Sequence, residues 1–231
     1  MRVLAVSDAL EDALLADLSP VRGAELILSC GDLPFSYLGH LMNALDVPLV
    51  FVPGNHDPDL SGYRTSKAGL TLRAGFPTRA PWPDGALNAD GRIVDVAGLR
   101  VAGLGGCRRY SGGPNQYSDR EQARRARRLA RRLRLRRARD GRGVDVLLTH
   151  APPRGAGDGP DPAHQGFTAL NVFVTRVRPA VALHGHVHPA GRADLRLGGT
   201  VVRNVTGWHL LEIEPGVGLI HDSPAGQRRA R

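Results

Sequence analysis

Five short segments of the chain carry side chains of the kinds that bind divalent metal ions. Asp8 follows one apolar run, and Asp32 follows another. The segments 54–57 (Gly-Asn-His-Asp), 149–150 (Thr-His) and 185–188 (Gly-His-Val-His) come later, again after short β-like runs. Carboxylate oxygens combined with imidazole nitrogens suit manganese, iron or zinc. The set predicts a pocket for divalent ions and metal-assisted hydrolysis of a phosphate ester.

Glycines stand directly before several of these candidate ligands. Gly31, Gly54 and Gly185 each occupy a position where a strand is expected to turn sharply. Glycine tolerates the left-handed or crowded backbone that such turns require. His186 and His188 are two residues apart, so in an extended segment they share one face.

The candidate ligands come at the ends of predicted strands. Apolar runs at 3–6, 24–29 and 48–52 predict three strands, and helices are expected at 12–18 and 35–44. This alternation favours the α/β class with a parallel sheet. Open sheets of this class generally place their sites at the carboxyl ends of the strands.

The rest of the chain is expected to continue as mixed helices and strands. Region 58–91 is rich in glycine and proline and predicts loops around one short strand at 70–72. Later elements are expected as a hairpin at 92–104, strands at 144–148 and 180–183, a helix at 167–176, and tail strands at 200–205, 208–213 and 218–221. We predict a single domain over 1–221 and a disordered basic tail over 222–231.

Composition narrows the class of protein. The chain has 231 residues, 42% of them hydrophobic, which is ordinary for a soluble globular protein. No apolar run is long enough for a membrane helix, and the first run is too short for a signal peptide. Two cysteines, Cys30 and Cys107, fit a reducing compartment as small buried side chains. We therefore expect a cytoplasmic protein with no membrane partner.

All of the excess charge lies in one segment. Residues 119–142 contain twelve arginines and three acidic residues, an excess that equals the net charge of +9. Within it, 119–139 is expected to be a helix whose apolar stripe is formed by Ala123, Ala126, Ala130 and Leu133. The helix could dock on the sheet and expose a solvated basic face, or it could follow the phosphates of a nucleic acid. Its few aromatic residues argue against base stacking.

The ordered motifs, from Asp8 to the segment ending at His188, resemble the calcineurin-like metallophosphoesterase family. The resemblance implies a four-layer α/β/β/α sandwich and two divalent ions, with manganese as the first expectation and iron or zinc also fitting. It implies that Asp8 and His188 bind the first ion and that Asp32 bridges the two ions. The ligands implied for the second ion are Asn55, His150 and His186.

The same resemblance assigns roles to two further residues. His56 would act on the leaving group as a general acid or would stabilise the transition state. Asp57 would be the catalytic-motif residue that orients the motif. The first motif departs from the family pattern, because Leu10 stands where a histidine is usual. We therefore expect the first metal site to be weak; the alternative is a mononuclear or very metal-selective enzyme.

Two glycine-rich loops, 105–117 and 157–167, resemble loops of bacterial branches of the family that share the altered first motif. Candidate substrate-binding residues in them are Arg108, Arg109, Tyr110, Asn115 and His164. Arginine side chains suit phosphate groups. The alternatives are a plain connection for the first loop and a surface histidine at the His164 position.

The leading hypothesis is a phosphoesterase that cleaves a phosphodiester or phosphomonoester in a small phosphorylated or nucleotide substrate by in-line attack of metal-bound hydroxide. One alternative is a DNA or RNA nuclease that holds the backbone with helix 119–139. The other is a non-catalytic metal- or ligand-binding regulator.

Overall fold

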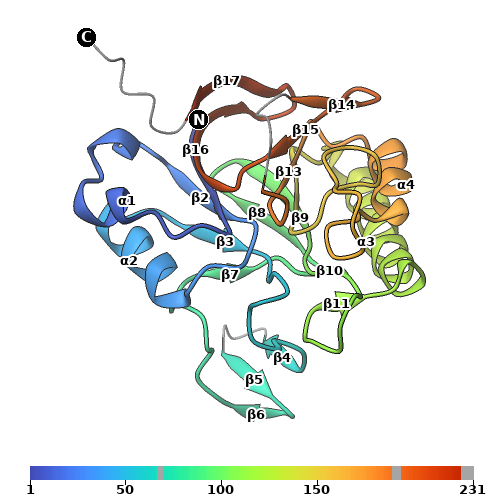
Figure 1. The fold of residues 1–231 in the computed structure, drawn as a ribbon, viewed down its shortest axis with the longest axis horizontal. Coiled ribbons are helices and arrows are strands. Elements are labelled where there is room, and N and C mark those ends of the chain that lie inside the picture. The colour runs from blue at the N-terminus through green and yellow to red at the C-terminus, as the bar shows by residue number, and fades with distance from the viewer. Residues whose placement is uncertain (67–69, 189–193, 225–231) are drawn as a thin grey trace.

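The molecule has two β-sheets packed face to face, with helices on both outer faces (Figure 1). The computed structural model describes residues 1–66, 70–188 and 194–224. The expected four-layer α/β/β/α sandwich is confirmed. Within the described ranges, no helix combines the length and the apolar character that crossing a membrane requires.

The first sheet contains the N-terminal strand at an inner position. Its strands, in spatial order, are β17 (Gly218–Pro224), β16 (Gly207–Glu214), β1 (Arg2–Ser7), β2 (Leu26–Ser29), β3 (Leu49–Phe51) and β7 (Leu87–Asn88). Strands β1, β2, β3 and β7 run parallel, whereas β16 pairs antiparallel with β1. Val3 therefore has Leu26 on one side and Leu211 on the other.

The second sheet is formed by residues between 93 and 204. Its strands, in spatial order, are β14 (Leu195–Leu197), β15 (Thr200–Asn204), β13 (Val181–His184), β12 (Val146–Thr149), β9 (Leu99–Leu104) and β8 (Ile93–Val96). The four inner strands are parallel, and the two edge strands are antiparallel to their neighbours. The parallel strands of both sheets end near one another, which brings the candidate ligands together.

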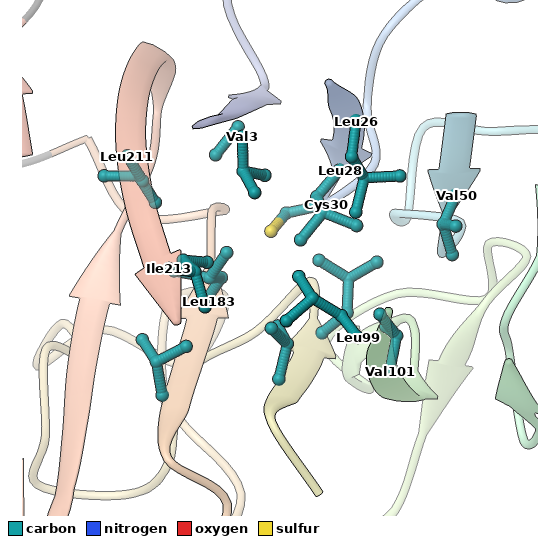
Figure 2. Close-up of a cluster of buried hydrophobic side chains, with 14 of the residues drawn as sticks. Val3, Leu26, Leu28, Cys30, Val50, Leu99, Val101, Leu183, Leu211 and Ile213 are labelled. Atoms are coloured by element: carbon teal, nitrogen blue, oxygen red, sulfur yellow. The ribbon is translucent and has the colours of Figure 1, made fainter. Parts of the chain in front are cut away.

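The inner faces of the two sheets form one continuous core. Val3, Leu28 and Leu211 from the first sheet meet Val101 and other aliphatic side chains from the second, and all are fully buried (Figure 2). Burial on both faces explains why these strands appear in the sequence as unbroken apolar runs instead of alternating patterns.

Helices fill the outer layers. The first sheet is covered by α1 (Asp12–Ala16), a 3₁₀ turn (Ser19–Val21) and α2 (Phe35–Leu45), and the second by α3 (Asp119–Asp140) and α4 (Thr168–Val177). Helix α3 begins with a capping box in which the Ser118 side chain accepts a hydrogen bond from the Glu121 amide while the Glu121 carboxylate accepts one from the Ser118 amide. It ends at Gly141, which adopts the left-handed conformation.

The buried stripe of α3 differs from the predicted one. The buried side chains are Gln122, Ala126, Leu129 and Leu133, so Ala123 and Ala130 lie at its margin. A glutamine is an unexpected member of a buried stripe. Its Nε2 donates to the Gly105 carbonyl at 3.4 Å, which satisfies the polar group on burial.

The structure also contains more strands than the sequence predicted. Region 58–91 was expected to hold one strand but contains a small antiparallel sheet of β4 (Tyr63–Thr65), β5 (Thr71–Arg73) and β6 (Phe76–Pro77). Ala74 and Gly75 make its last turn with positive φ angles, and alanine gives no sequence signal for that conformation. Two-residue strands β10 (Cys107–Arg108) and β11 (Gln116–Tyr117) pair in parallel.

The end of the chain differs as well. Strand β17 continues to Pro224, so residues 222–224 are paired with β16 and do not belong to a disordered tail. Residues 225–231, the remainder of the predicted tail, lie outside the described residues.

Candidate metal centre

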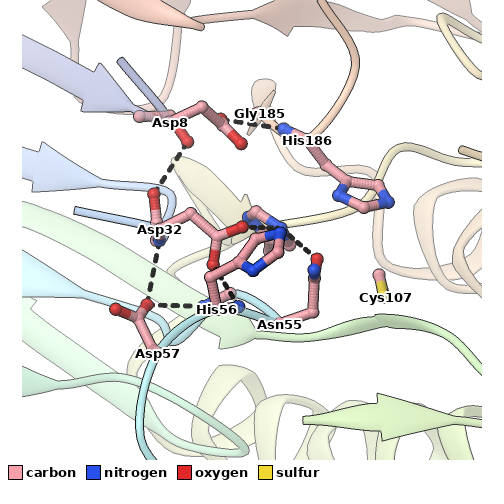
Figure 3. Close-up of polar contacts among 12 residues, drawn as sticks. Asp8, Asp32, Asn55, His56, Asp57, Cys107, Gly185 and His186 are labelled. Carbon is pink, nitrogen blue, oxygen red and sulfur yellow. Dashed lines mark hydrogen bonds and ion pairs between the residues drawn. The ribbon is translucent and has the colours of Figure 1, made fainter. Parts of the chain in front are cut away.

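The candidate ligands come from both sheets and meet at one edge of the sandwich (Figure 3). Asp8 follows β1, Asp32 follows β2 and Asn55 comes after β3. His150 directly follows β12, and His186 comes two residues after β13. The carboxyl ends of parallel strands supply all five positions, as expected for a site in an α/β protein.

Four of these residues form a compact cluster, which we call the four-residue cluster: Asp8, Asp32, His150 and His186. Their ligand atoms all lie within 4.8 Å of one another. Both histidines are buried, and both carboxylates are partly exposed. Two carboxylates and two imidazoles in this space form a donor set suited to a divalent ion such as manganese, iron or zinc. The residues present therefore fit the metal that the sequence predicts.

His150 is oriented by a backbone carbonyl. Its Nδ1 donates to the Cys30 carbonyl oxygen at 2.8 Å, so Nε2 points toward Asn55 Oδ1 at 3.0 Å and Asp32 Oδ2 at 3.3 Å. Such a bond to the second ring nitrogen is how proteins typically orient a metal-binding histidine. Burial alone would lower the pKa of His150, but the hydrogen bond and negative charge of Asp32, with the charge of Asp8, raise it to about 9. A metal ion would therefore replace a proton at Nε2.

His186 is held in the opposite protonation state. Burial and the nearby positive charge of His150 lower the pKa of His186 to about 4. The ring is therefore neutral, and its Nε2 donates to the Ala163 carbonyl oxygen at 2.7 Å. That bond leaves Nδ1 as the ring atom with a lone pair, which is the form required of a metal ligand.

Three members of the cluster adopt left-handed backbone, which is uncommon for residues other than glycine. The φ angles of Asp8, Asp32 and His186 are 62°, 58° and 67°. Left-handed backbone costs roughly 1–2 kcal/mol for a residue with a Cβ. Hydrogen bonds hold the turns: the His186 amide donates to Asp8 Oδ2, and the His56 amide donates to Asp32 Oδ1, each at 2.8 Å. Strain of this kind concentrates at functional sites.

Two glycines are required because other groups occupy the space beside them. A Cβ at Gly54 would overlap the Asp32 carboxylate and the His150 ring. A Cβ at Gly185 would overlap the side chains of Ser7 and Asp8. The crowded turns predicted from the sequence at these positions are therefore present.

His56 and Asp57 have different environments. Asp57 is buried, and its Oδ2 accepts hydrogen bonds from the Gly54 amide at 2.8 Å and the Asp32 amide at 2.9 Å. Burial raises the pKa of Asp57 above its ordinary value. His56, by contrast, is exposed and faces a cavity. Asp57 therefore positions the loop, while His56 is free to contact a ligand.

The cavity in front of the cluster has a volume of about 580 Å³. It is lined by Asp8, Asp32, Asn55, His56, Tyr110, Ala163, His164, His186 and His188. The Tyr110 hydroxyl accepts a hydrogen bond from the Asn55 side chain at 3.2 Å. His188 borders the cavity as an exposed side chain and is not part of the four-residue cluster.

His164 is a second imidazole on the cavity wall. Its Nδ1 lies 2.9 Å from Asp161 Oδ2, and its ring centre is 5.2 Å from that of His186. We did not predict a role for Asp161, although an aspartate three residues before a histidine in a loop could have indicated it. The carbonyls of Cys30 and Ala163 could not be predicted, because backbone groups leave no signal in residue types.

Three predicted substrate-binding residues do not line the cavity. The Arg108 side chain donates to Gln165 Oε1 at 2.7 Å. Arg109 pairs at 2.9 Å with Glu121, the residue that also caps α3. The Asn115 side chain donates to the Gly54 carbonyl at 2.8 Å, so it braces the motif loop.

Leu10, the residue that alters the first motif, lies away from the cavity. The Leu10 side chain is exposed and does not line the cavity. It leaves the cluster without an imidazole from the β1 end.

The sequence matches a family model for calcineurin-like phosphoesterases over residues 1–190. That span includes every metal-binding candidate. The chain belongs to the calcineurin-like phosphoesterase family. The match agrees with the resemblance carried by the motifs. No curated protein sequence matches the chain.

Solved structures with a similar fold include TT1561 of Thermus thermophilus. It is 17% identical, with 93% of this chain and 97% of that chain covered and a TM-score of 0.58. At this identity the likeness shows the fold alone. Vps29 of Entamoeba histolytica complexed with Zn²⁺ is 14% identical, with 94% of this chain and 88% of that chain covered, and its TM-score of 0.45 is too low to support an argument.

Proposed function

We propose that this protein is a metal-dependent phosphoesterase that hydrolyses a phosphodiester or phosphomonoester in a small phosphorylated or nucleotide substrate. The observation that carries the proposal is the four-residue cluster, whose ligand atoms lie within 4.8 Å of one another beside a cavity bordered by an exposed histidine. The cavity volume of about 580 Å³ is within the usual range for small-molecule sites.

Asp8, Asp32, His150 and His186 would hold the metal, with Asn55 Oδ1 beside His150 as a further oxygen donor. His188 at the cavity rim would complete a second ion site if two ions bind. Manganese is the first expectation for this mixed oxygen and nitrogen set, and iron or zinc would also fit. When bound, divalent ions supply Lewis-acid chemistry: they neutralise phosphate oxygens and lower the pKa of water.

The protein's own residues would bind the substrate and manage its proton. His56 is exposed on the cavity wall, where its imidazole can donate a proton to the leaving-group oxygen. Asp57 fixes the loop that carries His56, through its bonds to the amides of Gly54 and Asp32. Tyr110 and His164 form the remaining polar wall against which a phosphate ester would be oriented.

A non-catalytic binding function is the second candidate, and Leu10 is the observation that favours it. An exposed leucine cannot coordinate an ion, so the ion nearest Asp8 would have one protein ligand fewer. A protein of this kind would bind metal without turning over substrate.

Hydrolysis of an aryl phosphodiester and an aryl phosphomonoester, measured with Mn²⁺, Mg²⁺, Zn²⁺ and Ni²⁺, separates these candidates. Asn55→Ala removes the amide next to His150, and Asn43→Ala on the exposed face of α2 is the matched control. Metal-dependent turnover that Asn55→Ala loses and Asn43→Ala keeps would support the esterase. Metal binding without turnover for any of the four ions would contradict it and favour a binding function.

A further inference from the structure

Some arginines of α3 are used to dock the helix on the protein. Arg125 forms an ion pair with Asp90, and its guanidinium lies 4.0 Å from the centre of the Tyr117 ring. Arg136 pairs with Asp95 at 2.9 Å. Docking therefore explains the arginines on this side of the helix.

Eight other arginines of α3 have no such explanation, and six of them lie on one face of the helix. These six are Arg120, Arg124, Arg127, Arg131, Arg134 and Arg137, and all are exposed. Within the described ranges, none of these side chains takes part in an ion pair or a hydrogen bond. Their spacing of three or four residues places them on one face of the helix, over a length of about 25 Å.

This face borders a groove between α3 and α4, which lie side by side (Figure 1). One hollow of about 510 Å³ has a floor of Ala123, Ala169 and Val172. A second hollow of about 570 Å³ has a floor that includes Leu133 and Val177. Arg127 lines both hollows, so they lie next to each other, and we call them together the arginine groove.

The arginine groove has almost no compensating negative charge. Arg176 adds to the positive charge in the second hollow, whereas Arg142, which also lines it, lies 3.8 Å from Asp145. Asp119 is the one acidic residue among those that line the two hollows, and its Oδ1 already accepts a hydrogen bond from the Thr168 amide at 3.1 Å. A surface with this much unpaired positive charge is complementary to a polyanion.

The groove begins at the same end of the sandwich as the candidate metal centre. Helix α3 follows β11, and α4 follows the loop that carries His164, so both helices start near the carboxyl ends of the parallel strands. The bond between Asp119 and Thr168 joins their first turns. From there the groove runs along the outer face of the second sheet, away from the cavity.

We infer that the arginine groove binds the phosphate backbone of a nucleic-acid strand. Guanidinium groups bind phosphates through paired hydrogen bonds, and the surfaces that bind nucleic acid are far more positively charged than those that bind protein. No aromatic side chain lines either hollow, so the contacts are to the phosphates and do not include base stacking.

This inference does not depend on the proposed esterase activity, because no residue that lines the groove also lines the catalytic cavity. Binding is therefore measured with EDTA present, using the full chain and a fluorescent single-stranded oligonucleotide of mixed sequence. The groove variant is Arg127→Gln with Arg131→Gln. The matched control is Arg128→Gln with Arg139→Gln, which removes two exposed charges from the same helix outside the groove.

The measured quantity is the slope of log K against log salt concentration, over roughly 50 to 200 mM salt. Each phosphate contact to single-stranded nucleic acid contributes about −0.7 to this slope. We expect the groove variant to reduce the magnitude of the slope by about 1.4 and the control to stay close to the wild type. An equal reduction in both variants would show diffuse charge attraction and would overturn the inference.

Two further outcomes would also overturn it. One is the absence of salt-dependent binding in the wild-type protein. The other is that polyglutamate binds as tightly as the oligonucleotide and depends on the same two arginines, which would assign the groove to an acidic protein partner.

Discussion

The metal centre and the arginine groove gather charged side chains in opposite ways. The four-residue cluster uses few residues, drawn from four strand ends, and holds three of them in left-handed backbone. The groove takes most of its arginines from one regular helix, and among the described residues the six exposed arginines form no ion pair or hydrogen bond through their side chains. In the cluster a single displaced atom removes a ligand, whereas in the groove each arginine adds one small increment. Substitutions should therefore act as all-or-none changes in the first region and additively in the second.

The largest effect is expected for Gly54→Ala. The added Cβ would overlap the Asp32 carboxylate and the His150 ring, so both ligands must move. Loss of a residue that orients a metal ligand typically weakens metal affinity by about 10–100-fold. We expect Gly54→Ala to weaken manganese binding by more than this. Isothermal titration measures this. Gly112→Ala is the control, since no atom lies within 4 Å of its new Cβ. Wild-type affinity in Gly54→Ala would show that the cluster tolerates displacement.

His56→Ala should separate catalysis from metal binding. The imidazole is exposed and is not part of the cluster, so we expect metal stoichiometry to remain unchanged. Loss of a proton donor should lower kcat by about 10²–10⁴-fold. His40→Ala, which removes an exposed histidine of α2, provides the control for kcat. A kcat equal to that of the wild type would remove His56 from the reaction.

Metal affinity should rise with pH. The neighbouring carboxylates raise the pKa of His150 to about 9, and a proton competes with the ion for Nε2. Below that pKa, each unit of decrease in pH should weaken manganese binding by up to about tenfold, with release of a proton on binding. Titrations in buffers of different ionisation enthalpy measure both quantities. Affinity that stays constant between neutral pH and pH 9 would mean that His150 is already neutral.

The smallest effect is expected in the groove. Arg131→Gln removes an exposed side chain without partners, so the free energy of unfolding in urea should change by no more than about 0.5 kcal/mol. Arg100→Gln is the contrasting variant, because Arg100 is buried and paired with Asp95 and Asp140. Its replacement should lower the free energy of unfolding by about 1–3 kcal/mol. Equal costs would show that the groove arginines also support the fold.

The motifs and apolar runs predicted the main features of the fold correctly. Strands at 3–6 and 48–52 were expected because residues buried on both faces leave unbroken apolar runs. The short strands at 63–65, 76–77 and 195–197 were missed, because two- and three-residue strands carry too little pattern. Their pairing depends on neighbours that are brought close only by the tertiary structure.

For the site, residue types indicated which side chains could bind metal but not which loops would face the cavity. Tyr110 and His164 do face it, while Arg109 turns away to Glu121. The capping role of Glu121 can be predicted from the neighbouring sequence. Its ion pair with Arg109 cannot, because that contact depends on how the loop folds back. The groove was hidden for a similar reason, since part of its lining comes from α4, where Val172 and Arg176 give no signal of their own.

The pairing of β1 with β16 has a consequence for the folding pathway. The Met1 amino group donates to the Ile213 carbonyl across 212 positions of sequence, and the His186 amide reaches Asp8 across 178. Contacts this distant in sequence carry a large loop-closure entropy, so they form late and slowly. Asp8 can occupy its place only after this closure. Metal binding should therefore be among the last kinetic phases of refolding. The helices should form well before the metal site does.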